Sequence, residues 1–160
     1  MKRAELVSLV DQAYATYNQN LPTDGDRLKA VYMAWFALLH DLDIKEARAA
    51  FTHLAVVERF MPRPGDVRRT AINRRNNFTQ FEDAVSAWGK FVGIVRDTNS
   101  GVPITVEVSE ALRETMKALG EAAYNMHTNS DRDAFTKTYD RVVSEIDERR
   151  YAVPEVEEDG

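Results

Sequence analysis

Apolar residues recur at spacings of three and four positions along almost the whole chain, and this repeat constrains the fold more than any other feature. One example is the helical face formed by Ile44, Ala47, Phe51, Leu54 and Val57. Such spacing is typical of an amphipathic helix. The best strand candidate, residues 102–108, is short, and an isolated strand has nothing to pair with. The sequence therefore predicts an all-α fold of about seven helices.

These helices are expected to form two packed helical subdomains. The pair Asn76-Asn77 marks the boundary, so that residues 1–76 form an N-terminal subdomain and residues 77–150 a three-helix C-terminal subdomain. Residues 151–160 are acidic and contain a proline, and we expect them to form a disordered tail.

Two further expectations concern the second subdomain. Gly89 and Gly93 lie inside a helical pattern, where they are expected to permit close packing of helices. The sixth helix is expected to run through Met126.

A proline-rich corner interrupts the helical pattern in the first subdomain. Pro62 and Pro64 are expected to stop the preceding helix near Phe60, because proline lacks the backbone N–H and clashes with the preceding turn. Gly65-Asp66 is then expected to start a short helix that ends near residue 75. The sequence thus predicts a structural corner made by Pro62, Pro64, Gly65 and Asp66.

Arginines gather around this corner. Residues 59–75 contain six of them, with Asp66 as the only carboxylate. On the short helix, Val67, Ala71 and Ile72 are expected to face inward and the arginines to cover the exposed arc. An exposed cationic surface binds DNA phosphate or an acidic patch on a protein. The alternative interpretation is a solvated helix face that pairs with the acidic second half. The predicted partner-binding residues are Arg63, Arg68, Arg69, Arg74 and Arg75.

The charge of the chain is divided unevenly. The net charge is −5, but residues 1–76 carry +3 and residues 77–160 carry −8. The 160 residues include no cysteine, which excludes disulfides and thiolate metal sites and suits the cytoplasm. No apolar run approaches the roughly 18 residues of a membrane span. We therefore expect a cytoplasmic protein that does not interact with membranes.

The motifs of common enzyme classes are absent from the sequence. There is no G-x-x-x-x-G-K-[ST] phosphate loop and no G-x-S-x-G nucleophile turn. None of the three histidines has another histidine four residues away, so no helical metal-binding pair exists. The chain is therefore interpreted as a non-enzyme without a cofactor or metal.

Residues 28–69 resemble the N-terminal domain of phage proteins that load or inhibit the replicative helicase. The matching pattern is an aromatic and leucine-rich helix (residues 35–42), an alanine-rich helix (residues 47–60) and the corner at residues 61–68. The second half is similar to a region that often accompanies this domain in actinobacterial phages. Matching positions there include Ala87-Trp88, Ala111-Leu112 and Phe135.

The resemblance implies a small helical adaptor that acts in the host cytoplasm. Such a protein binds the hexameric replicative helicase, and loads or inhibits it without hydrolysing ATP; a replication initiator is a second implied partner. Two alternatives remain open. The chain could be a DNA-binding accessory or regulatory protein that contacts the phosphate backbone, or a chaperone of virion assembly.

Overall fold

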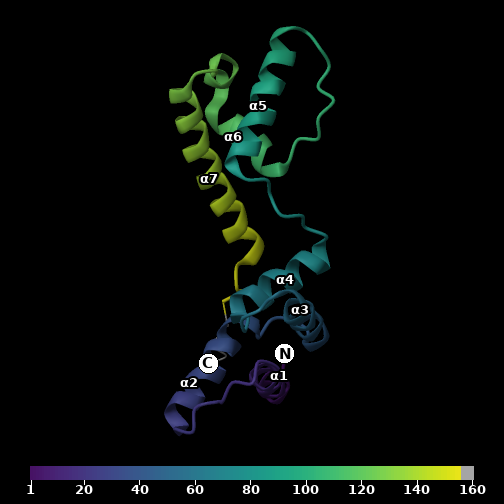
Figure 1. The fold of residues 1–160 in the computed structure, drawn as a ribbon, viewed down its shortest axis with the longest axis vertical. Coiled ribbons are helices and arrows are strands. Elements are labelled where there is room, and N and C mark those ends of the chain that lie inside the picture. Colours follow the sequence, from purple (N-terminus) through teal and green to yellow (C-terminus); the bar gives the residue numbers. More distant parts are fainter. Residues whose placement is uncertain (156–160) are drawn as a thin grey trace. The chain divides into compact units, whose positions relative to one another are not determined.

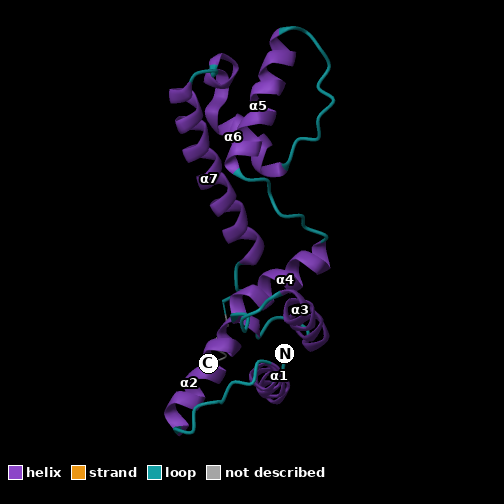
Figure 2. Cartoon of the chain, in the orientation of Figure 1, coloured by secondary structure: helices purple, strands orange, loops and turns teal. Residues whose placement is uncertain are grey.

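The structure is a computed structural model that describes residues 1–155 (Figure 1). All regular structure within these residues is helical, which confirms the predicted all-α class (Figure 2). The elements are α1 (Arg3–Thr16), α2 (Gly25–Leu39), α3 (Ile44–Val57), α4 (Pro64–Asn76), α5 (Ala84–Asn99), α6 (Glu110–Leu119), the 3-10 helix η1 (Gly120–Asn125) and α7 (Asn129–Tyr151).

The chain divides into two compact units. Unit 1 comprises Met1–Thr79 together with the C-terminal segment that begins at Tyr151, and unit 2 comprises Gln80–Arg150. The first boundary lies three residues beyond the predicted one. The second boundary differs in kind, because Tyr151 ends α7 and belongs to unit 1 instead of opening a disordered tail. Residues 152–155 of the predicted tail are described and form no helix, and residues 156–160 lie outside the described residues.

Unit 1 is built from four helices around one apolar core. α3 packs mainly on α4, while α1 contacts both α2 and α3, and α2 also contacts α4. Trp35 and Phe51 are buried in this core. Aspartates fix the start of two of these helices: the side chain of Asp24 accepts the Arg27 N–H, and that of Asp43 accepts the Lys45 N–H.

Unit 2 holds a second core that is rich in aromatic rings. Trp88, Phe91, Phe135 and Tyr139 form a chain of ring contacts with centroids 4.8–5.8 Å apart. These distances are those of favourable aromatic pairs. The Tyr139 hydroxyl also donates a hydrogen bond to the Glu82 carbonyl at 2.9 Å. The core therefore ties α5 and the segment before it to α7.

Several local predictions were wrong. α3 ends at Val57 instead of near Phe60, because Glu58 is extended and residues 58–60 are exposed, so packing does not hold them in a helix. The sixth helix ends at Leu119, where Gly120 adopts a positive φ of 62°. A Cβ added at Gly89 or at Gly93 would meet no atom within 4 Å, so these glycines do not permit close packing.

Candidate protein-interaction surface and the Arg68 site

Arg68 is buried, and the prediction that it lies on the exposed arc of α4 was wrong. Only 4% of its surface is exposed, and its guanidinium makes a bidentate ion pair with Asp41 at 2.6 and 3.1 Å. The same group donates to the carbonyl of Leu38 at 3.0 Å, to that of Tyr151 at 2.8 Å and to that of Ala152. All five N–H donors of the guanidinium are therefore used. While the C-terminal segment is in place, Arg68 has no donor left for an external partner.

Three residues of α4, Arg68, Asn73 and Arg69, hold the C-terminal segment. Beyond the two carbonyls that Arg68 contacts, the hydroxyl of Tyr151 donates to the Asn73 side-chain oxygen at 2.6 Å. The guanidinium of Arg69 lies 5.4 Å from the centroid of the Tyr151 ring, within cation–π range. These contacts explain why the predicted disordered tail does not begin at residue 151.

The electrostatics of Asp41 reflect this pairing. Partial burial disfavours its ionised form, but the hydrogen bonds and the positive charge of Arg68 outweigh burial and lower the pKa of the carboxyl below its ordinary value. Asp41 is thus ionised at neutral pH and balances the buried guanidinium. The neighbouring Asp43 has a different role, since its side chain caps the start of α3.

The other predicted partner-binding arginines are exposed. Arg75 pairs loosely with Glu46, at 3.6 Å, with both side chains partly in solvent. Within the described residues Arg63, Arg69 and Arg74 make no ion pair with a carboxylate. The structure therefore divides the predicted set: Arg68 is structural, and the remaining four reach solvent.

The corner is built largely as the sequence suggests. Pro62 is buried, and Pro64 is the first residue of α4, where the missing N–H has no helical partner to lose. The carboxylate of Asp66 accepts the backbone N–H of Arg63 at 3.0 Å and so closes the first turn. The helix begins at Pro64, one residue before the predicted start at Gly65. The corner thus fixes the direction in which α4 begins.

An exposed apolar cluster beside this corner was missed by the sequence analysis. Val56, Val57 and Phe60 are 82%, 60% and 78% exposed. The Arg59 guanidinium lies 5.9 Å from the centroid of the Phe60 ring. Val57 was expected on the buried face. A signal was present for Val56, which falls outside the apolar stripe of α3, where an amphipathic surface helix normally carries polar residues.

We define the corner patch as Val56, Val57, Arg59, Phe60 and Arg63. It combines large apolar side chains with guanidinium groups, and aromatic and arginine residues are enriched at the energetic centres of protein interfaces. Large apolar side chains that are exposed close together in the chain are unusual on a soluble protein, and exposed apolar surface of this kind is typical of interaction sites. The corner patch is therefore the candidate interaction surface of unit 1.

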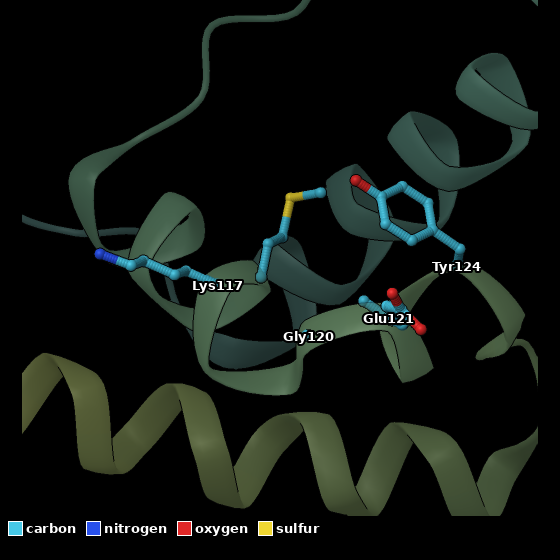
Figure 3. A pocket seen from close by; sticks show the side chains of 6 residues that line it. Lys117, Gly120, Glu121 and Tyr124 are labelled. Carbon is cyan, nitrogen blue, oxygen red and sulfur yellow. The ribbon is translucent and has the colours of Figure 1, made fainter.

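A shallow pocket of about 330 Å³ in unit 2 is lined by Met116, Lys117, Gly120, Glu121, Ala123 and Tyr124. Figure 3 shows the Lys117 ammonium and the Tyr124 ring on opposite sides of it. The lining brings together one cation and one carboxylate but no nucleophile beside a base. Among the described residues no group of three or more His, Cys, Asp or Glu side chains is placed to hold a metal ion.

None of the helices in residues 1–155 is both long and apolar enough to cross a bilayer. No protein-family model matches the chain, and neither a curated protein nor a solved structure shows significant similarity to it. The fold and the surface thus define the chain at the level of class: an all-α protein of two helical units, with an apolar and cationic patch on the first.

Proposed function

We propose that the chain is a phage replication adaptor that binds the hexameric replicative helicase through the corner patch, and that it has no catalytic activity of its own. The observation that carries the proposal is the exposure of Val56, Val57 and Phe60 next to Arg59 and Arg63. A surface that served phosphate alone would need only the guanidinium groups. The apolar side chains favour a protein partner, since their burial drives protein association.

The choice of a helicase as that partner rests on the resemblance of residues 28–69 to phage helicase loaders and inhibitors. The corner patch lies within this region, at the turn that joins its last two helices. The absence of a phosphate loop from the sequence supports an adaptor whose partner hydrolyses the ATP. In this function the protein works in the host cytoplasm, where it loads or inhibits the helicase, and a replication initiator is its second partner.

The test is binding of the purified host replicative helicase to the Phe60→Ala variant. Truncating a residue at the centre of an interface costs about 2 kcal/mol, so affinity is expected to fall by roughly 30-fold. The matched control is Val85→Ala in unit 2, because Val85 is also a large exposed apolar residue, at 62%. A Phe60→Ala variant that binds the helicase as tightly as the wild type does would contradict the proposal.

The ATPase rate provides a second readout. The protein alone is expected to hydrolyse no ATP, and the helicase rate is expected to change only when the adaptor is added. ATP hydrolysis that persists with the isolated protein through further purification would contradict the non-catalytic assignment.

The exposed arginines favour one second candidate, a protein that contacts the DNA backbone. Arg63, Arg69 and Arg74 make no ion pair among the described residues, which leaves their charge available to phosphate. DNA affinity would then fall with salt at a slope of about −0.9 per phosphate contact and would not depend on Phe60. That result would favour the second candidate over the adaptor. Co-purification with a virion structural protein would instead favour an assembly chaperone.

A further inference from the structure

The Arg68 site has the properties of a preformed recognition site. Three of the five guanidinium N–H groups are taken by residues close to it in unit 1: the carbonyl of Leu38 and both oxygens of Asp41. These bonds fix the plane of the guanidinium whether or not the C-terminal segment is present. The other two N–H groups then point at two successive main-chain carbonyls, those of Tyr151 and Ala152. Because both acceptors are main-chain carbonyls, these two bonds do not depend on which side chains the peptide carries.

Specificity for one side chain comes from two further residues of α4, Asn73 and Arg69. Asn73 accepts the hydroxyl of Tyr151 at 2.6 Å, and the Arg69 guanidinium lies against the ring at 5.4 Å. The side chain of Ala152 is exposed, so the residue after the tyrosine is not read. The site therefore selects a tyrosine whose own carbonyl and whose successor's carbonyl are both free to accept.

We propose that α4 carries a peptide-binding site, that the segment Tyr151–Ala152 occupies it in the intact chain, and that another tyrosine-containing peptide can displace this segment. The segment acts as a latch on unit 1. Its opening leaves Arg68 paired with Asp41, so the buried charge is not stranded and the site stays formed. This proposal does not rest on the helicase or on the corner patch.

The covalent connection sets how strongly the latch competes. A tethered occupant has an effective concentration on the order of 1 mM. If the free peptide binds an empty site with a Kd of about 0.1 mM, the tethered segment weakens its apparent binding by roughly 10-fold. Weakening the latch should therefore reveal a binding activity that the wild type largely conceals.

The probe is a fluorescent synthetic peptide with the sequence of residues 148–155, ERRYAVPE. Its anisotropy is measured against the full-length wild type and the full-length Tyr151→Ala variant. We expect the variant to bind the peptide about 10-fold more tightly than the wild type does. The control peptide carries the Tyr151→Ala change and is expected to bind neither protein. Adding Asn73→Ala to the variant should weaken binding of the tyrosine peptide.

A second variant keeps the test decisive if Tyr151→Ala does not fold. Tyr151→Phe retains the ring and both carbonyls and loses only the bond to Asn73, and it should give an intermediate affinity. A wild-type dimer at high protein concentration that Tyr151→Ala abolishes would also support the proposal, because the segment then occupies the site of a second copy. The proposal is overturned if neither variant binds the peptide better than the wild type does, or if the control peptide binds equally well.

Discussion

Replacing Asp41 with asparagine is expected to destabilise unit 1 by about 3 kcal/mol. The side chain of Arg68 is 5% exposed, and Asp41 is its only carboxylate partner among the described residues. Breaking a buried ion pair by removing one charge costs about 3–5 kcal/mol, because the other charge is left uncompensated. Asparagine keeps the size and one acceptor oxygen, and the Asp41 side chain is itself 21% exposed. We therefore expect a value at the lower end of this range.

The two tryptophans make the assay specific for one unit. Trp35 is buried in unit 1 and Trp88 lies in unit 2, and the chain contains no other tryptophan. In a Trp88→Phe background, urea unfolding followed by tryptophan fluorescence reports on unit 1 alone. The matched control is Glu46→Gln, which removes the loose and partly exposed pair with Arg75 at 3.6 Å. Exposed pairs contribute about 0–1 kcal/mol, so this control should change little.

The pH dependence gives an independent check on the same ion pair. Because Arg68 lowers the pKa of Asp41 in the folded protein, the pair's contribution is complete above the unfolded pKa of about 3.9 and is lost as the pH falls through the lower folded value. The Asp41→Asn variant should lack this loss. An Asp41→Asn variant with the same free energy of unfolding as the Glu46→Gln control would refute the conclusion that the buried Arg68–Asp41 pair stabilises unit 1.

Three further predictions concern unit 2. Gly89→Ala and Gly93→Ala should each stabilise the protein by about 0.5–1 kcal/mol in thermal unfolding, because alanine is the better helix former and its Cβ meets open space. Burial and the nearby Glu82 carboxylate raise the pKa of Tyr139 to about 12. Its contribution to stability should therefore be complete below pH 10 and fall as the pH rises toward 12. The urea midpoint of a Tyr139→Phe variant should depend less on pH over this range than that of the wild type, and an equal dependence would contradict the prediction. Hydrogen bonds from Thr128 and His127 lower the pKa of Asp131 to about 2. The contribution of Asp131 to stability should therefore be lost only as the pH falls from about 4 toward 2. An NMR titration of its carboxyl carbon with a midpoint near 4 would disprove this prediction.

The features that the sequence predicts well are those set by neighbouring residues. The helical repeat and the proline corner depend on residues within one or two turns of each other. The division into two helical units follows from the same local signals, and its first boundary differs by only three residues.

The features that the sequence analysis missed depend on contacts between residues that are far apart in the chain. Arg68 looks like a surface arginine because its polar partners, apart from those at the end of α2, lie 83 and 84 residues further along the chain. The local sequence holds one hint that the sequence analysis missed: Arg68 lies three and four positions before the buried Ala71 and Ile72, on the same face of α4. The exposure of Val57 has a similar cause, since an apolar residue on the right helical face is buried only where another element covers the end of the helix.

The insertion of unit 2 between the two parts of unit 1 has a consequence for vectorial synthesis on the ribosome. Arg68 leaves the exit tunnel long before its last acceptor, which follows 84 residues later. At about 5–20 residues per second, this interval lasts roughly 4–17 s. Throughout it, the nascent first unit has two guanidinium N–H groups that must be satisfied by water. Unit 2 is translated in full before the last contacts of unit 1 can form, so premature termination anywhere within unit 2 leaves both units incomplete.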